Sequence, residues 1–323
     1  MISIRRVLGM VAIACAATPA LAQQEAEPLH VRNLNPLVSI FGLPAWDTVA
    51  PGSRLETTAE IANHYRLSAR GTDRLILDGE TDRTTLSFAH GFDGGWSLGA
   101  ELPYYHVGGG FLDGTIDAWH SAFGLPDGGR DLPHDRLLFE IGRSGTDFFV
   151  LDHARSGIGD VQLKFAKAIG DERQFVVQVA AKLATGDATM LSGSGSTDAS
   201  ITLLRSQPLT VRRRPAGYYW GMGVVLAGKP DGIRFESNRW VYTGILGGSW
   251  QPWPKLCLKA QLDFHGAFFN TPLKEFGAAA SLFTFGAWHP LGRRGTLDFA
   301  IIEDIRVGTA PDVGLQAAAK WRW

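Results

Sequence analysis

The last eleven residues decide the fold: positions 313–323 read Val-Gly-Leu-Gln-Ala-Ala-Ala-Lys-Trp-Arg-Trp. Every odd position in this stretch is apolar, whereas the even positions include Gln316, Lys320 and Arg322. A period of two over about eleven residues is typical of a tilted strand that crosses a membrane with one face toward lipid. The terminal strand of a soluble β-sandwich stays open as the alternative.

The same alternation recurs along the chain. It is clearest over 256–266, where leucines and Phe264 form one face and Lys259, Asp263 and His265 lie on the other. Other alternating segments lie at 54–66, 86–104, 161–166, 175–184, 199–207, 218–227, 240–251, 277–288 and 296–305. The sequence therefore predicts an all-β fold, a closed antiparallel transmembrane β-barrel of about 12 strands (12–14).

The composition agrees with a β-protein that does not bind nucleic acid. The chain has 323 residues, of which 45% are hydrophobic and 20% charged, and its 31 basic residues balance 32 acidic ones. Such a balance excludes both a disordered chain and a polybasic nucleic-acid binder. Glycine contributes 39 residues, beside ten Trp and eighteen Phe, which favours turns and strands over helices.

The N-terminus indicates export. Arg5 and Arg6 precede a short apolar run, and Ala20-Leu21-Ala22 forms a small-residue cleavage site, so residues 1–22 are predicted to be a signal peptide. The residues before Cys15 make a poor lipidation box. Cleavage leaves 29 basic and 32 acidic residues and a single thiol, so no disulfide forms within one mature chain. We expect 23–52 to be a periplasmic segment and 53–323 to be the barrel.

The aromatic end of the chain carries a second signal. Trp321 and Trp323 look like the assembly signal of outer-membrane barrels. The expected location is the outer membrane of a Gram-negative cell. The expected partners are its lipids and lipopolysaccharide, the export and barrel-assembly machinery, and an unknown small solute.

Connection lengths give the orientation, because such barrels have short periplasmic turns and longer outer loops. The short turns 93–95, 170–173 and 251–254 fall on one side, and the longer segments 67–80, 185–198, 228–239 and 267–275 on the other. One extracellular insert, 105–157, is exceptionally long; it has a short helical pattern and, at 137–141 and 148–151, two stretches that would form an extra hairpin. We expect it to cover or enter the lumen, with these gate or plug candidates: Asp113, Asp117, Trp119, His120, Asp127 and Arg130.

The polar face of the strands predicts a charged lumen. A barrel of about twelve strands is too wide for its own side chains to fill, so water or an inserted segment must occupy it. The predicted lining residues carry both signs of charge: Arg54, Glu56, Glu60, His64, Arg66, Lys164, Lys182, Lys259, Asp263, His265, Lys320 and Arg322.

Three functions fit this pattern. A channel or transporter for small or hydrophobic solutes is the first interpretation, and a non-conducting structural barrel is the second. The third is a lipid hydrolase, for which His90 with Ser87 or Ser97 offers strand residues, although alternation turns His64 and His265 toward the lumen. The Gly95–Gly99 stretch around Ser97 lacks the strand–turn–helix context of a hydrolase elbow. Neither metal-binding nor cofactor motifs occur in the sequence.

The central segment also carries a resemblance. Residues 108–113, 116–120 and 123–130, together with 33–36, 159–160, 182–187, 193–198 and 310–312, resemble an uncharacterised family of Gram-negative outer-membrane barrels catalogued as a domain of unknown function. The resemblance covers nearly all of the mature chain and implies a barrel in the outer membrane. It implies no catalytic or binding residues. Ala184 departs from the family pattern, in which proline is expected.

Overall fold

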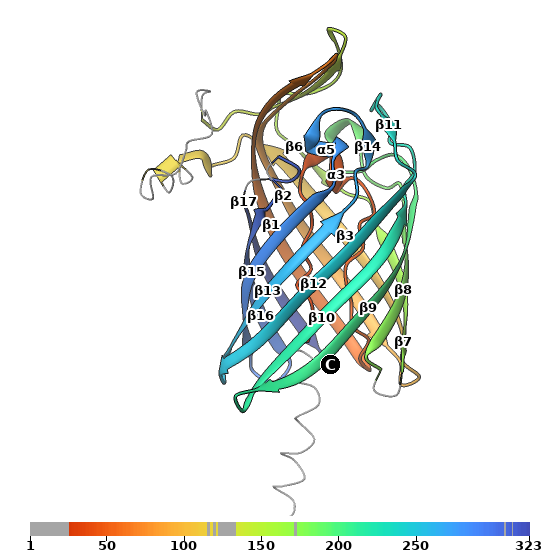
Figure 1. The fold of residues 1–323 in the computed structure, drawn as a ribbon, viewed down its shortest axis with the longest axis vertical. Helices are drawn as coiled ribbons and strands as arrows, with labels where there is room; N and C mark the ends of the chain where they lie inside the picture. Colours follow the sequence, from red (N-terminus) through yellow and green to blue (C-terminus); the bar gives the residue numbers. More distant parts are fainter. Residues whose placement is uncertain are drawn as a thin grey trace, which may run out of the picture.

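Twelve antiparallel strands close into a barrel, which confirms the predicted fold (Figure 1). The computed structural model describes residues 26–114, 117–118, 121, 134–170, 173–306, 308–311 and 313–323. The strands of the wall are β1 (Gly52–Arg70), β2 (Asp73–Gly91), β3 (Trp96–Gly108), β7 (Gln162–Ile169), β8 (Phe175–Lys182), β9 (Asp198–Val211), β10 (Arg214–Leu226), β12 (Trp240–Trp253), β13 (Leu256–His265), β15 (Ala280–Leu291), β16 (Gly295–Asp304) and β17 (Val313–Arg322). The pairing of β1 with β17 closes the ring.

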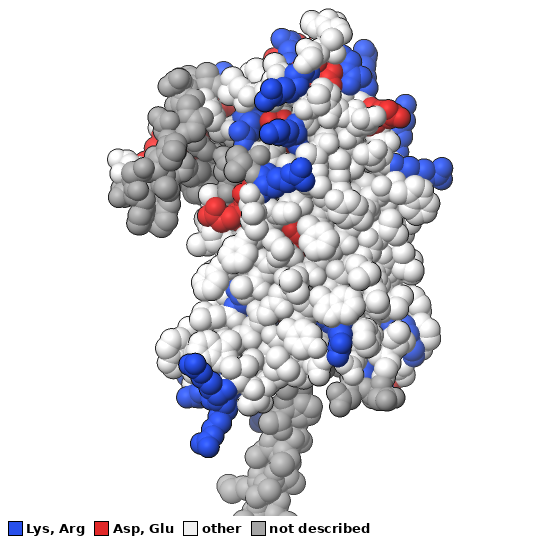
Figure 2. Space-filling view, viewed as in Figure 1, with Lys and Arg blue, Asp and Glu red and all other residues white. Residues whose placement is uncertain are grey.

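Alternation along each strand sorts side chains to the two faces of the wall. In β13, Cys257, Lys259 and Gln261 are buried inside, whereas Ala260 is exposed outside. The outer face is apolar over its middle: in Figure 2 the charged side chains of the visible face gather toward the two ends. This belt is the surface that a bilayer covers. Among the described residues, no helix is long and apolar enough to cross a membrane.

The connections separate into two ends, as expected. Short turns join β2 to β3, β9 to β10, β12 to β13 and β15 to β16 at the end where the chain terminates, here called the short-turn end. Gly95, with φ +74°, supplies the left-handed conformation that the β2–β3 turn requires. The predicted outer loop 67–80 is wrong, because β1 and β2 continue as a 19-residue pair and turn at 71–72.

The insert forms a hairpin outside the ring. Strands β4 (Leu138–Arg143) and β5 (Thr146–Leu151) pair with each other, and β4 extends the sheet along residues 73–78 of β2, beyond the last pairing of β3. The predicted extra hairpin therefore exists but adds no strand to the barrel wall. The following β6 (Arg155–Ile158) pairs with residues 104–107 of β3, and β7 pairs with residues 96–101 of the same strand. The two strands therefore lie one after the other along the same edge of β3.

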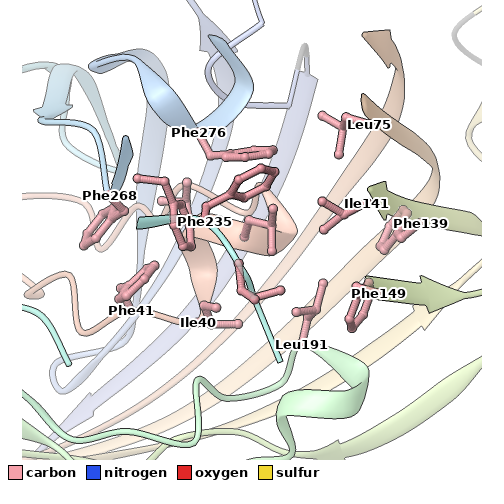
Figure 3. Packing of buried hydrophobic residues seen from close by; sticks show 14 of the residues in the cluster. Ile40, Phe41, Leu75, Phe139, Ile141, Phe149, Leu191, Phe235, Phe268 and Phe276 are labelled. Atoms are coloured by element: carbon pink, nitrogen blue, oxygen red, sulfur yellow. The ribbon is translucent and has the colours of Figure 1, made fainter. Parts of the chain in front are cut away.

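An apolar cluster fills the opposite, long-loop end of the barrel. It joins the α3 helix (Pro36–Ser39) with β2, β4, β5 and the outer loops, including the short pair β11 (Glu236–Ser237) and β14 (Phe269–Asn270), the α5 turn (Lys274–Gly277) and the loop that holds η1 (Ala188–Met190). Figure 3 shows the rings of Phe41, Phe235, Phe268 and Phe276 turned toward one another, with Phe41 stacked on Phe268 at 4.2 Å between ring centroids. We call this cluster the apolar cap.

Candidate functional site: the plugged lumen

Residues 26–51 run inside the barrel, and nearly all of them are buried. The expectation of a periplasmic segment over 23–52 differs from this finding; residues 23–25, like the predicted signal peptide 1–22, lie outside the described residues. The apolar content of the segment explains the difference, because Leu37, Ile40 and Phe41 gain more from burial in the apolar cap than from exposure to water. We call residues 26–51 the plug segment.

The plug segment crosses the lumen and returns. Ala26 lies at the short-turn end, where its carbonyl accepts a hydrogen bond of 2.5 Å from Ser206 Oγ. At the far end α3 reverses the direction of the chain: Pro36 begins the helix, and the Asn35 side chain caps it by accepting from Leu37 N at 3.1 Å. Tyr105 donates to Ser39 O at 3.2 Å and fixes the turn against β3. The chain then descends to Gly52, where β1 starts.

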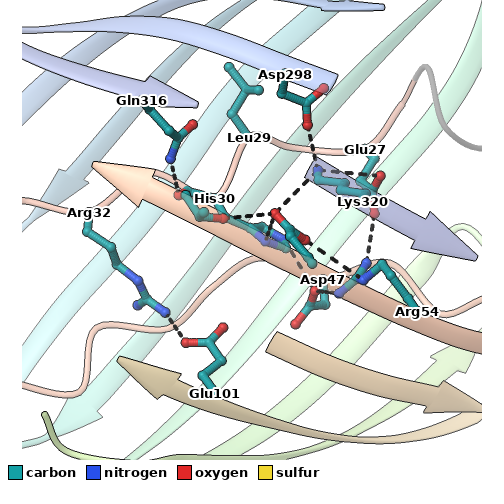
Figure 4. Close-up of polar contacts among 12 residues, drawn as sticks. Glu27, Leu29, His30, Arg32, Asp47, Arg54, Glu101, Asp298, Gln316 and Lys320 are labelled. Atoms are coloured by element: carbon teal, nitrogen blue, oxygen red, sulfur yellow. Dashed lines mark hydrogen bonds and ion pairs between the residues drawn. The ribbon is translucent and has the colours of Figure 1, made fainter. Parts of the chain in front are cut away.

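Glu27 is the first ionic anchor of the plug segment. Its carboxylate accepts from Arg54 Nη1 at 2.8 Å and from Arg322 Nη2 at 2.6 Å, and Lys320 Nζ lies 3.9 Å away. Its backbone carbonyl accepts from Lys259 Nζ at 2.6 Å. Wall cations from β1 and β17 thus surround a single buried carboxylate, and Figure 4 shows Arg54 and Lys320 beside Glu27.

His30 and Asp47 form the second anchor, where the ascending and descending parts of the plug segment meet. His30 Nδ1 lies 3.1 Å from Glu56 on β1, and His30 Nε2 lies 3.2 Å from Asp47. Because ionised carboxylates only accept hydrogen bonds, an imidazole placed between two of them is satisfied when both nitrogens carry protons. Asp47 also accepts from Arg54 and Lys164.

Arg32 forms the third anchor. Its guanidinium donates to Glu101 Oε2 on β3 at 2.7 Å and also to Leu43 O in the descending part of the plug segment. Glu101 in turn accepts from Lys164 Nζ at 2.9 Å, so the second and third anchors share one lysine. The three anchors are thus one connected network of buried charges, each with an opposite partner.

Neutral side chains of the wall satisfy the backbone of the plug segment. Gln261 accepts from Leu29 N and donates to Leu29 O, both at 2.9 Å, as a neighbouring strand would. Gln316 donates to His30 O at 2.6 Å, and Gln178 donates to Ala45 O at 2.9 Å. An extended segment can therefore lie in the lumen without joining the sheet.

The structure places the predicted lumen residues inside the barrel. Those in contact with the plug segment are Arg54, Glu56, Lys164, Lys259, His265, Lys320 and Arg322. The others bind wall or loop groups: Glu60 binds Arg83, His64 binds Thr81, Arg66 lies 3.9 Å from Glu275, Lys182 binds Asp160, and Asp263 binds Gln261. The sequence patterns did not predict five partners of these residues: Glu27, His30, Arg32, Asp47 and Glu101. The apolar residues of 34–46 were the available signal, because such a stretch is rarely left in water.

The predicted gate residues do not gather in the lumen. Asp113 accepts from Asn63 Nδ2 at 2.9 Å and from Asp135 N at 2.9 Å, beside Glu80 on β2. Asp117 lies 2.9 Å from His134. In Figure 1 this part of the insert, drawn in yellow, lies outside the barrel wall. Trp119, His120, Asp127 and Arg130 lie outside the described residues.

The serines and histidine considered for hydrolysis also lie apart. Ser87 is buried on the inner face, and Ser97 borders a small lumen cavity together with Asp47. His90 instead contacts Ser53 on the outer face, with 2.9 Å between Nδ1 and Oγ. The pairing of His90 with Ser87 or Ser97 is therefore absent from the structure.

Little free volume remains around the plug segment. Three cavities that border it measure about 20 Å³, 50 Å³ and 20 Å³. A cavity needs about 10–15 Å³ to hold one water. In the conformation described, each of these cavities has room for at most a few waters. Within the same residues, no cluster of three or more His, Cys, Asp or Glu side chains is suited to a metal ion.

Comparison with known proteins identifies the family. Residues 5–323 match the family described as "Protein of unknown function (DUF3187)", and the chain belongs to it. No curated protein matches the sequence significantly. The fold is similar to that of the COG4313 outer membrane channel from Pseudomonas putida F1, with a TM-score of 0.51 and 11% identity over 88% of this chain and 98% of that one.

Two further solved structures show a weaker likeness. They are the NanC porin, with a TM-score of 0.44 and 10% identity over 83% of this chain and 98% of that one, and the CymD monoaromatic hydrocarbon channel, with a TM-score of 0.41 and 10% identity over 94% and 97%. At these identities the likeness concerns the fold alone, which is that of outer-membrane β-barrels.

Proposed function

We propose that this protein is an outer-membrane channel for small or hydrophobic solutes, held closed by the plug segment. The observation that carries the proposal is the way this segment is attached. Within the described residues its covalent link to the wall is at Gly52, and its other anchors are ion pairs and hydrogen bonds. Because water can replace the partners in ion pairs and hydrogen bonds, the segment can leave the wall without breaking a covalent bond.

The charges of the wall support a lumen that fills with water once the plug segment leaves. Arg54, Glu56, Lys164 and Lys320 each have a partner in the plug segment or beside it. Without those partners they must be hydrated, because an unpaired buried charge is costly. An empty lumen is therefore expected to be a wet pore with charges of both signs.

The apolar cap supports hydrophobic solutes at the long-loop end. Phe41 of the plug segment packs there against Phe268 and Phe269. When the plug segment moves, these rings lose their partner and offer an apolar entrance. The same proposal includes a location in the outer membrane and contact of the barrel with lipids and lipopolysaccharide. The insert stays part of the proposal, but we assign the role of plug to residues 26–51.

Conductance in planar lipid bilayers tests the proposal. Wild-type protein is expected to be closed for most of the time, and deletion of residues 26–50 is expected to give steady conductance. A disulfide between Gly42→Cys and Asp198→Cys is expected to abolish the openings. The Cβ positions are 3.2 Å apart and need to separate by a few tenths of an ångström for ordinary disulfide geometry.

The reduced form of the same double variant is the matched control, because it carries both substitutions without the cross-link. Its openings should return on addition of a reductant. Heat-dependent mobility on a denaturing gel reports whether each variant is a closed barrel. A folded deletion variant without current would contradict the channel and favour the non-conducting structural barrel.

A further inference from the structure

Three polar side chains form a row on the outer face of the wall. Register places Asp82 of β2 directly opposite His106 of β3, and His106 directly opposite Ser156 of β6. His106 and Ser156 are exposed. Tyr104 and Ile158, the next outward residues on the same two strands, are 49% and 52% exposed. The outer row (Asp82, His106, Ser156) therefore faces away from the lumen, toward lipid.

The geometry of the outer row is that of a nucleophile beside its base. His106 Nδ1 lies 2.7 Å from Ser156 Oγ, so the hydroxyl donates to the ring when Nε2 carries the proton. His106 Nε2 lies 3.0 Å from the position that a Cβ would take at Gly108, so glycine leaves room for the ring. Asp82 Oδ1 is buried and has no hydrogen-bond partner among the described residues. This carboxylate is placed to stabilise positive charge on the imidazole.

The position of the outer row relative to the apolar belt indicates which bond of a lipid molecule would lie beside it. Below it lie the exposed apolar side chains of Tyr104 and Ile158, and beyond it lie the exposed Asp152, His153 and Arg155. The row therefore sits at the boundary between the apolar belt and the polar end of the barrel. In a bilayer this boundary is the depth at which fatty-acyl esters join the headgroup to the acyl chain.

We propose that the outer row is a second functional site, an acyl hydrolase that cleaves a fatty-acyl ester of a membrane lipid. Ser156 is the nucleophile, His106 is the general base, and Asp82 is a positioning residue. This site is independent of the lumen, so it stands or fails separately from the channel.

A groove beside the outer row fits the acyl chain of such a lipid. Its volume is about 720 Å³, and Asp82 stands at its edge. Register continues the row from Asp82 through Ile61, Leu315 and Ile301 to Phe285. Below that line the small side chains of Ala59, Ala317 and Ala287 form the floor, and the exposed ring of Phe299 stands between the last two. An apolar groove on the lipid side of a barrel is open to one abundant occupant, a fatty-acyl chain.

The reaction balances with water alone. Ser156 Oγ attacks the ester carbonyl while His106 Nδ1 takes the hydroxyl proton. The bond between the carbonyl carbon and the alcohol oxygen then breaks, and His106 returns the proton to the leaving alcohol. Water repeats the sequence on the acyl-serine: His106 takes its proton, the hydroxide adds to the carbonyl, and Ser156 leaves with the proton as the fatty acid is released.

Release of fatty acid by the purified full-length barrel tests the site. The probes are phosphatidylethanolamine vesicles in one arm and lipopolysaccharide in the other, and the active arm identifies the source of the ester. Ser156→Ala and His106→Ala are each expected to lower the rate by at least about 100-fold. Asp82→Asn is expected to lower kcat by a smaller factor and to leave KM unchanged, because an amide no longer stabilises the imidazolium that forms in the transition state.

Ser53→Ala is the matched control. Ser53 and His90 are also paired on the outer face, but Leu98 stands opposite His90 where the outer row has a carboxylate. Its activity should equal that of the wild type. A fluorophosphonate probe should label the wild type and leave Ser156→Ala unlabelled, and heat-dependent gel mobility checks folding. No fatty acid from either lipid, or an undiminished rate in folded Ser156→Ala, overturns the proposal.

Discussion

Lys164 joins the plug segment to the wall through one ammonium group. It is 4% exposed at the side chain, binds Asp47 of the plug segment and lies 2.9 Å from Glu101, which also holds Arg32. Lys164→Met removes one positively charged partner from each of two buried carboxylates, Asp47 and Glu101. We expect it to lower the free energy of unfolding by about 3–5 kcal/mol, measured by urea titration in detergent micelles.

Lys167→Met is the control on the same strand. Lys167 lies at the surface, where Nζ donates to Gly94 O and stands 4.1 Å from the centroid of the Trp96 ring. Its loss should cost less than about 1 kcal/mol, because surface pairs of this kind contribute little. Equal costs at both positions would mean that the network around Asp47 adds nothing to stability.

Side-chain direction could be predicted for regular strands but not the partners across the lumen. Alternation placed Lys259 and His265 inside, where the structure has them. It gave no sign that Leu29 would bind Gln261, because the two are 232 positions apart and 26–51 has no period. Likewise alternation could have placed His106 outside, yet Ser156 lies 50 positions later, beyond the insert. Contacts at such separations exist only once the barrel has closed.

The β4–β5 hairpin is held on β2 by a charge pair above the ring of the barrel. Arg143 Nε donates to Asp73 Oδ1 at 2.6 Å, and Thr271 donates to Asp73 Oδ2 at 2.7 Å. The hydrogen bond from Arg143, helped by that from Thr271, holds the pKa of Asp73 below its ordinary value. A carboxyl group with a lowered pKa stabilises the docked hairpin above its ordinary pKa of about 3.9, and this stabilisation is lost as pH falls through the lowered value.

Acid should therefore loosen the hairpin from β2. Spin labels at Arg70→Cys and Thr146→Cys report the distance between the two hairpin tips, and its distribution should broaden as pH falls below about 4. With Asp73→Asn the distribution should already be broader at neutral pH and change little with acid. A distribution that responds to acid equally in both proteins would assign the effect to other groups.

The number of wall strands could be predicted from single elements, because apolar and polar residues alternate within each wall strand. The hairpin at 138–151 also carries strand residues, yet it stays out of the ring for a geometric reason. Residues 73–78 of β2 extend beyond the end of β3 and offer a free edge, which β4 occupies. The period of two predicted the strands, whereas the unequal lengths of β2 and β3 decided which of them close the barrel.

At the scale of the whole molecule, the barrel closes where its first wall strand meets its last. β1 pairs with β17, and Ser53 and Trp323 exchange backbone hydrogen bonds of 2.8 Å and 3.0 Å at the short-turn end. These bonds involve only main-chain atoms, whereas the Trp323 side chain is 56% exposed on the outside. The ring of the last residue thus contributes little to the closed barrel. We propose that any need for it arises earlier, while the chain is being assembled into the membrane.

Trp323→Ala separates these two stages. In refolding from urea into detergent, we expect the temperature of the gel-mobility shift to stay close to the wild-type value, because an exposed ring loses little burial. In cells, the amount in the outer membrane should fall several-fold, measured by fractionation. Trp240→Ala, at a side chain 65% exposed at the start of β12, is the control and should fall in neither assay. If Trp323→Ala refolds poorly in detergent, the ring stabilises the barrel itself and the assembly role is wrong.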